Sequence, residues 1–143
     1  MIKNDVITKD PFEKNIRKTL NYGHTLGHAI ESYSLDQNKF PSLLHGEAIA
    51  IGMVLTNYIS FVQLGFPEKT LSDTSHYIIK KFNKYLFSKE DINAIIKLLK
   101  FDKKNSCGKV LFVLLNDIGN YKLNCEVSNS LLLEAFEYYK NYK

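Results

Sequence analysis

The segment RKTLNYGHTLGHA, residues 17–29, gathers side chains that can bind ions or move protons. Arg17, Asn21, His24 and His28 are four, three and four residues apart, so a continuous helix would present them on one face. Histidines at i and i+4 can share a metal ion, and arginine binds carboxylate or phosphate through paired hydrogen bonds. The spacing therefore predicts a site for a metal and an anion.

Gly23 and Gly27 directly precede the two histidines. Glycine inside a helix costs about 1 kcal/mol relative to alanine and marks the close approach of a neighbour or a ligand. We expect the helix to accept this cost for access to the histidines. The competing interpretations are a metal-free, hydrogen-bonded histidine pair and a solvated face on which Arg17 pairs with Glu13.

A third histidine, His45, stands in LLHGEA at the start of a long apolar segment. Alone, an imidazole in such a place is more often a hydrogen-bonded core residue. Together with His24 and His28 it gives a set of three imidazoles, which is typical of zinc or iron sites. Further along, FDKKN places Lys103 next to Lys104, and adjacent lysines are usually solvated.

The length and composition predict one globular domain, and the sequence shows none of the common nucleotide-binding or nucleophile motifs. The 143 residues are 45% hydrophobic, which suffices for a single core. The formal charge of +4 comes from dispersed lysines and indicates anionic small ligands rather than nucleic acid. Cys107 and Cys125 form no metal-ligand pattern, which predicts reduced structural thiols and a cytoplasmic setting. No GxGxxG, Walker or Ser/His/Asp pattern supports nucleotide binding or nucleophilic catalysis within the chain.

The elements that must hold the histidines are predicted to be helices. After a short β-favouring piece, Asp10-Pro11 is expected to begin a helix that runs or restarts through residues 17–33. Residues 34–42 are predicted as a loop. Residues 48–66 contain no charge and approach the length of a membrane span, but their polar residues favour a buried core helix that ends at Gly65.

The second half of the chain predicts further helices and one hairpin. Residues 67–85 form an amphipathic helix, with its apolar face at Leu71, Ile78, Ile79 and Phe82. Ser88 and Ser128 are expected to cap helices over 89–99 and 131–139. The β-branched run 110–115, followed by a turn at 116–120, predicts a hairpin. We therefore predict a mainly α domain with one small β-hairpin.

Four separated blocks of the sequence resemble 3-dehydroquinate synthases, specifically their C-terminal domain. The blocks are Lys3 with Asp10-Pro11, RKTLNYGHTLGHA, LLHGEAIAIGM, and DKKN with FVLLNDIG. The resemblance implies that residues 1–143 form a single multihelical domain that binds metal and substrate. It also implies a partner that is absent from this chain, an N-terminal NAD-binding domain, and a homodimer of the full-length enzyme.

The resemblance further implies an activity and roles for single residues. Such enzymes use zinc and NAD to convert 3-deoxy-D-arabino-heptulosonate 7-phosphate to 3-dehydroquinate and phosphate, in the shikimate pathway of aromatic amino-acid biosynthesis. By this matching His24 and His45 are metal ligands, and His28 contacts the substrate. The other substrate contacts that it implies are Lys3 and Arg17 at the carboxylate, and Asn21 with Lys103 or Lys104 at the phosphate.

The same resemblance leaves alternatives. Because the family takes its NAD site and a third zinc ligand, a glutamate, from the N-terminal domain, we expect this chain alone to be inactive. Iron-dependent alcohol or glycerol dehydrogenases also carry an HxxxH pair and a later HG motif, but a neutral alcohol needs no anion clamp such as Arg17. Other sugar-phosphate cyclases share the motifs, and a non-catalytic helical metal-binding module is the alternative from another class.

Overall fold

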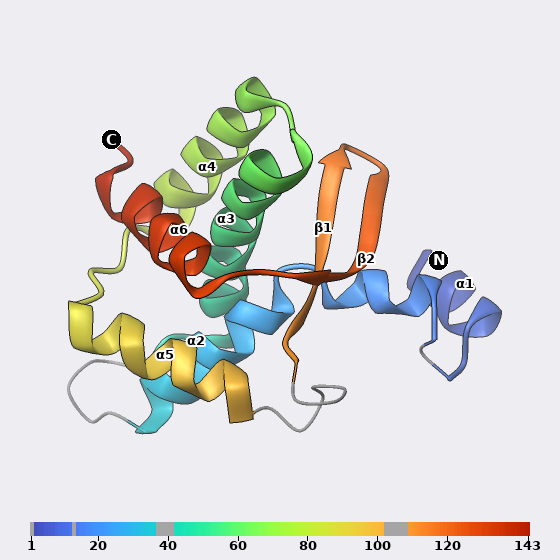
Figure 1. Cartoon of the computed structure of the whole chain (residues 1–143), viewed down its shortest axis with the longest axis horizontal. Coiled ribbons are helices and arrows are strands. Elements are labelled where there is room, and N and C mark those ends of the chain that lie inside the picture. Colours follow the sequence, from blue (N-terminus) through green and yellow to red (C-terminus); the bar gives the residue numbers. More distant parts are fainter. Residues whose placement is uncertain (1, 13, 37–41, 102–108) are drawn as a thin grey trace.

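The computed structural model describes residues 2–12, 14–36, 42–101 and 109–143 (Figure 1). Its elements are α1 (Ile2–Lys9), the 3-10 helix η1 (Ile16–Asn21), α2 (His24–Asp36), α3 (His45–Leu64), α4 (Glu68–Phe82), α5 (Lys89–Phe101), β1 (Leu111–Asp117), β2 (Asn120–Glu126) and α6 (Asn129–Asn141). The prediction of a mainly helical domain with a small hairpin is confirmed for the described residues.

Helix α3 is the centre of the fold, and it contacts α2, α4, α6 and β1 (Figure 1). Val54, Leu55 and Ile59 on this helix are fully buried. Length and composition alone would let α3 cross a membrane, but 61% of its apolar window is buried inside the protein. The helix ends at Gly65, whose φ of 74° is left-handed, as the sequence predicts.

Polar side chains within α3 bond to two of these neighbours. Ser60 is fully buried, and its Oγ accepts a hydrogen bond of 3.0 Å from the backbone N–H of Leu115 on β1. The Asn57 side chain is also buried, and its Nδ2 donates to Thr74 Oγ1 on α4 at 3.1 Å. An otherwise apolar helix is thus joined to a strand and to a helix at fixed points.

The predicted caps of the later helices are confirmed. Ser88 Oγ accepts from the Asp91 N–H at 3.1 Å, while Asp91 Oδ2 accepts from the Ser88 N–H at 2.8 Å. Ser128 Oγ accepts from the Leu131 N–H at 3.2 Å. On α4, however, the predicted apolar face is only partly buried, because Phe82 at its end remains 36% exposed.

The hairpin covers one side of α3 with its first strand. β1 and β2 pair antiparallel, with Leu111 opposite Glu126 and Leu114 opposite Lys122. Gly119 supplies the left-handed residue of the turn, with φ of 77°. Cys125 on β2 is buried and carries a free thiol, whose pKa is raised by burial, as expected of a structural cysteine. Cys107 lies outside the described residues.

The N-terminal predictions need correction. The supposed β-favouring piece forms α1, a helix without buried residues. Asp10-Pro11 does not begin a helix, because the Asp10 carboxylate instead accepts hydrogen bonds from the backbone N–H groups of Lys14, Asn15 and Arg17. The predicted loop begins later than Ser34, since α2 continues to Asp36 and the buried Ser34 Oγ accepts from the Leu43 N–H at 2.7 Å.

We expect Asp10→Ala to loosen the start of η1 at neutral pH. Desolvation raises the pKa of Asp10, but the backbone hydrogen bonds from Asn15, Lys14 and Arg17 outweigh it and hold the pKa below its ordinary value of 3.8. Because the folded form prefers the carboxylate, this contribution is present above that ordinary value and is lost as the pH falls through the lowered pKa.

Amide hydrogen exchange checks this expectation. Protection of the Asn15 and Arg17 amides should fall several-fold in Asp10→Ala at pH 7, and the difference from wild type should shrink as the pH falls through the lowered pKa of Asp10. Asp5→Ala, which removes the same charge from α1, should leave both amides unchanged. Equal protection in Asp10→Ala and wild type at pH 7 would contradict the capping role.

Candidate metal and substrate site

The three histidines predicted to act together do lie together. His24 begins α2, His28 follows one turn later, and His45 begins α3. The ring centroids are 5.3 Å apart for His24 and His28, 6.1 Å for His24 and His45, and 5.8 Å for His28 and His45. One nitrogen from each ring lies within 4.8 Å of the other two.

This donor set fits a divalent transition metal. Tetrahedral zinc with nitrogen ligands at about 2.1 Å holds those nitrogens about 3.4 Å apart, so the ligand nitrogens would need to approach one another by at most about 1.4 Å. His45 is exposed at the first turn of α3, so the packing around it leaves room for this small movement. Neutral imidazoles suit zinc, iron and cobalt in this arrangement.

Glycines allow the two histidine-bearing helices to touch. A Cβ at Gly52 of α3 would lie 2.2 Å from the Gly23 carbonyl oxygen and 2.8 Å from the Gly27 nitrogen. A Cβ at Gly27 would lie 3.0 Å from the Cα of Ile49. The glycines therefore admit the backbone of a neighbouring helix, and the interpretation that they give access to the histidines is corrected.

Gly23 also breaks the predicted helical stripe. Its φ of 74° separates η1 from α2, so Arg17 and Asn21 belong to a 3-10 helix while His24 and His28 belong to an α-helix. Residues four apart do not stack on a 3-10 helix, which repeats every three residues. The prediction of one continuous face carrying all four side chains is thus wrong.

Two of the histidines have a defined partner at Nδ1. His24 Nδ1 is 3.0 Å from the carbonyl oxygen of Tyr22, a group that can only accept, so this nitrogen carries a proton. His45 Nδ1 is 3.0 Å from Oε2 of Glu31 on α2. Both contacts leave Nε2 as the metal-binding nitrogen. Burial raises the pKa of the Tyr22 phenol above its ordinary value.

The remaining predicted residues are placed less completely. The Arg17 Nη1 donates to the Pro11 carbonyl at 2.6 Å, and Asn21 is the last residue of η1. Lys3 is exposed on α1, which packs on η1. Lys103 and Lys104 lie outside the described residues, as does Glu13, the alternative partner of Arg17. Within the described residues, the structure brings together the histidines of the predicted set.

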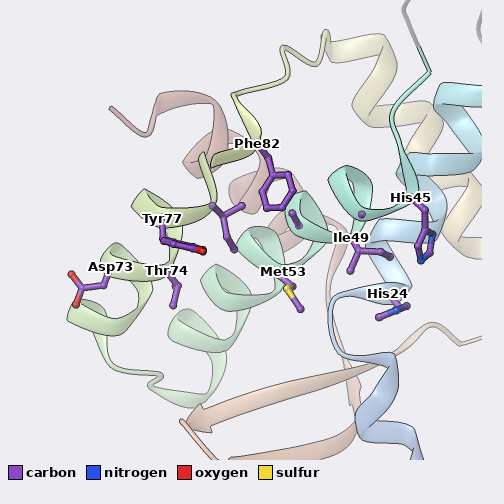
Figure 2. A pocket seen from close by; sticks show the side chains of 11 residues that line it. His24, His45, Ile49, Met53, Asp73, Thr74, Tyr77 and Phe82 are labelled. Atoms are coloured by element: carbon purple, nitrogen blue, oxygen red, sulfur yellow. The ribbon is translucent and has the colours of Figure 1, made fainter. Parts of the chain in front are cut away.

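A cavity of about 600 Å³ opens next to His24 and His45 (Figure 2). Its other walls come from α3 and α4 and are mostly apolar, with Ile49 and Met53 on one side and Tyr77, Ile78 and Phe82 on the other. Sequence reasoning missed this wall. Ile49 and Met53 follow His45 at four-residue intervals, a signal that places them on its helix face.

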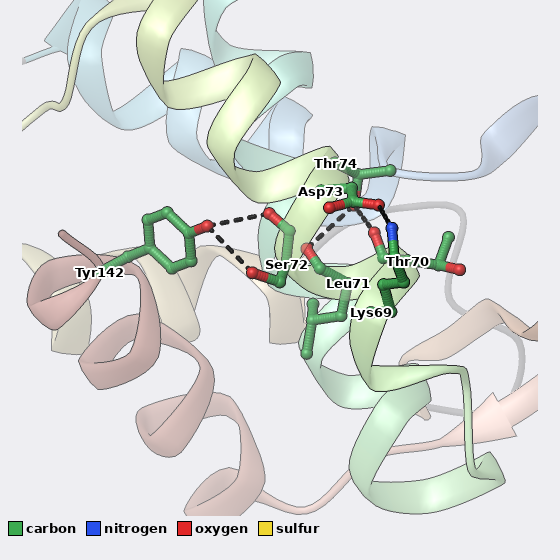
Figure 3. Close-up of polar contacts among 7 residues, drawn as sticks. All are labelled: Lys69, Thr70, Leu71, Ser72, Asp73, Thr74 and Tyr142. Atoms are coloured by element: carbon green, nitrogen blue, oxygen red, sulfur yellow. Dashed lines mark hydrogen bonds and ion pairs between the residues drawn. The ribbon is translucent and has the colours of Figure 1, made fainter.

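Polar groups on the α4 wall form hydrogen bonds or ion pairs with other protein groups (Figure 3). Asp73 pairs with Lys69 at 2.7 Å, and Thr74 Oγ1 donates to the Thr70 carbonyl at 2.8 Å. Directly after α6, Tyr142 Oη donates to the Ser72 carbonyl at 2.9 Å and so contacts α4. The polar chemistry of the cavity is therefore concentrated at its histidine end.

Solved structures with the same fold come from enzymes that cyclise sugar phosphates. A 2-deoxy-scyllo-inosose synthase, complexed with carbaglucose-6-phosphate, NAD+ and Co2+, matches 99% of this chain and 39% of its own, with a TM-score of 0.75 and 27% identity. The 2-epi-5-epi-valiolone synthase from Streptomyces hygroscopicus, with NAD+ and Zn2+ bound, matches 97% of this chain and 37% of its own, with a TM-score of 0.76 and 18% identity. The fold is that of the sugar-phosphate cyclases.

Sequence relatives narrow this class. The family model described as 3-dehydroquinate synthase C-terminal matches residues 1–105. The 3-dehydroquinate synthase of Parabacteroides distasonis is 37% identical over 139 residues, which is 97% of this chain and 39% of the relative. That of Thermodesulfovibrio yellowstonii is 42% identical over 129 residues, 89% of this chain and 34% of the relative. The chain belongs to the 3-dehydroquinate synthase family, and it spans less than two fifths of the length of these relatives.

Proposed function

We propose that this chain is the metal- and substrate-binding part of a 3-dehydroquinate synthase, which converts 3-deoxy-D-arabino-heptulosonate 7-phosphate to 3-dehydroquinate and phosphate. The observation that carries the proposal is the cluster of His24, His28 and His45 at the contact of α2 with α3. Family membership supports it, and so do the NAD+ and divalent metal in the structures of fold neighbours.

In this proposal the histidines divide two tasks. His24 and His45 hold a zinc ion through Nε2, and the ion when bound supplies Lewis-acid polarisation of a substrate oxygen. His28, whose ring centroid is 5.3 Å from that of His24, contacts the substrate and holds or releases a proton at a ring nitrogen. The protons on Nδ1 of His24 and His45 fix the tautomers that this division requires.

The anionic ends of the substrate are assigned to the N-terminal segment and to the segment after α5. Arg17 and Lys3 bind the carboxylate, and Asn21 with Lys103 or Lys104 binds the phosphate. Arg17 already lies half-buried on η1, with its backbone N–H fixed by the Asp10 carboxylate at 3.1 Å. An ordered backbone reduces the loss of freedom that an arginine suffers when it binds an anion.

The proposal includes parts beyond this chain. The relatives are more than twice as long, and we propose that their additional region supplies the NAD site and the remaining zinc ligand. The isolated chain should then not turn over substrate. A homodimer of the full-length protein belongs to the same proposal, and sedimentation of that protein tests it separately.

A fusion experiment tests the function. We expect the chain to become active when joined to the N-terminal region of the Parabacteroides distasonis relative, which is 37% identical over the shared part. With NAD+ and zinc, the fusion should release phosphate from the heptulosonate phosphate and form dehydroquinate, whereas the chain alone should not. Glucose 6-phosphate serves as the control substrate.

The possible results separate the candidates. If the fusion prefers glucose 6-phosphate, another sugar-phosphate cyclase becomes the better candidate. The structural similarity to a 2-deoxy-scyllo-inosose synthase is the observation that favours this alternative. Phosphate release by the isolated chain would contradict the proposed need for a second domain. A zinc-loaded fusion that acts on neither substrate would contradict the proposed function.

A further inference from the structure

We propose that Glu31 is a positioning residue that orients His45 for metal binding, an inference that rests on the metal site proposed above. Glu31 lies on α2, seven residues after His24 and three after His28, so all three occupy one face of that helix. Across the helix contact, Glu31 Oε2 lies 3.0 Å from His45 Nδ1.

The contact fixes both the tautomer and the angle of the ring. A carboxylate accepts hydrogen bonds, so Nδ1 of His45 carries the proton and Nε2 presents its lone pair. The His45 side chain is 57% exposed and that of Glu31 is 26% exposed, so surrounding packing restrains the carboxylate more than the imidazole. The carboxylate therefore acts as the fixed side of the pair, and the imidazole takes its orientation from it.

The contact between Glu31 and His45 is not needed to stabilise the fold. An exposed pair of this kind adds little to folding stability, even where both partners are charged. The start of α3 is held independently, because Glu47 Oε2 accepts from the Leu44 N–H at 2.9 Å. Carboxylates that accept from the second nitrogen of a metal-binding histidine raise its basicity and fix its direction, and their loss typically lowers metal affinity about 10- to 100-fold. The carboxylate of Glu31 stands in this relation to His45.

His24 shows the same arrangement with a different acceptor. Its Nδ1 lies 3.0 Å from a main-chain carbonyl, that of Tyr22, which no side-chain substitution removes. Of these two Nδ1 partners, Glu31 is therefore the one that a substitution can remove while both proposed metal ligands stay in place.

The first measurement uses the metal-free chain. Long-range nitrogen–proton correlation spectra report which ring nitrogen carries the proton, and wild-type His45 should be the Nδ1–H tautomer. In Glu31→Ala the signal should move towards the Nε2–H form that free histidine prefers in water. Glu31→Gln retains an accepting oxygen of the same shape and should keep the wild-type tautomer.

The second measurement follows zinc titration of the fusion protein, which contains the proposed third ligand, through the same signals. Glu31→Ala should weaken zinc binding about 10- to 100-fold, and Glu31→Gln should lie between Glu31→Ala and wild type because it restores the acceptor without the charge. Asp36→Ala removes a carboxylate from the end of the same helix and should match wild type in both measurements.

Two results would overturn the inference: an unchanged His45 tautomer in Glu31→Ala, or an unchanged zinc affinity in that variant. Failure of the wild-type fusion protein to bind zinc would instead contradict the proposed metal site, and the two failures are distinguishable because the tautomer is measured without metal. Thermal unfolding of Glu31→Ala close to wild type shows that the changes do not come from a loss of folding.

Discussion

In the fusion protein, His24→Ala and His45→Ala should each lose zinc and activity together. A bound zinc ion typically contributes on the order of 10 kcal/mol through a few ligands, so one ligand is worth about 3 kcal/mol, or roughly a 100-fold change in affinity. Zinc per protein, measured after dialysis against metal-free buffer, reports the first loss, and phosphate release reports the second.

His28→Ala should behave differently, with activity lost and zinc retained. This expectation follows from the assignment of His28 to the substrate, although all three histidines have a nitrogen within 4.8 Å of the others. If His28→Ala is as poor in zinc as His24→Ala, the division of tasks is wrong and a set of three histidine ligands becomes the better description. His76→Ala on α4 is the matched control, because this exposed histidine has no assigned role.

Gly52→Ala should cause a large loss of stability, because among the described glycines this position has the shortest contact to a neighbouring backbone atom. The new Cβ would lie 2.2 Å from the Gly23 oxygen and 2.8 Å from the Gly27 nitrogen, and these backbone atoms cannot turn away as a side chain can. Separating α2 from α3 exposes the core between them, so the free energy of unfolding should fall by about 3 kcal/mol or more.

Gly46→Ala provides the control for Gly52→Ala on the same helix. A Cβ at Gly46 meets no atom within 4 Å, so this change should be neutral or should stabilise the protein by about 0.5 kcal/mol or slightly more. Urea unfolding followed by circular dichroism measures both variants. A loss below about 1 kcal/mol in Gly52→Ala would show that the helices can separate without penalty and that the glycine contact does not fix their distance.

Much of the fold could be predicted because local signals agree with tertiary packing. The caps at Ser88 and Ser128, the end of α3 at Gly65 and the hairpin turn at Gly119 depend on residue types with strong positional preferences. The three histidines were found from the spacing of His24 and His28 and from the isolated HGE motif.

The N-terminal region could not be predicted in the same way. Apolar residues recur at helical spacing on both sides of Gly23, so their pattern does not show that the backbone turns there. The turn becomes necessary only when α3 lies against α2, a contact between residues far apart in the sequence. Glu31 was missed for a similar reason, because its partner His45 is 14 residues away on another helix.

The two polar contacts of α3 also select one alignment of the helices around the cavity. Apolar contacts alone do little to fix how far a helix is displaced along its neighbours, because one apolar surface is similar to the next. Moving α4 along α3 would take Thr74 away from Asn57 Nδ2, and moving β1 would take Ser60 Oγ away from the Leu115 N–H; each buried polar group left without a partner costs about 1–3 kcal/mol. These two contacts raise the energy of the other helix alignments. The cavity wall therefore keeps one position relative to the histidines.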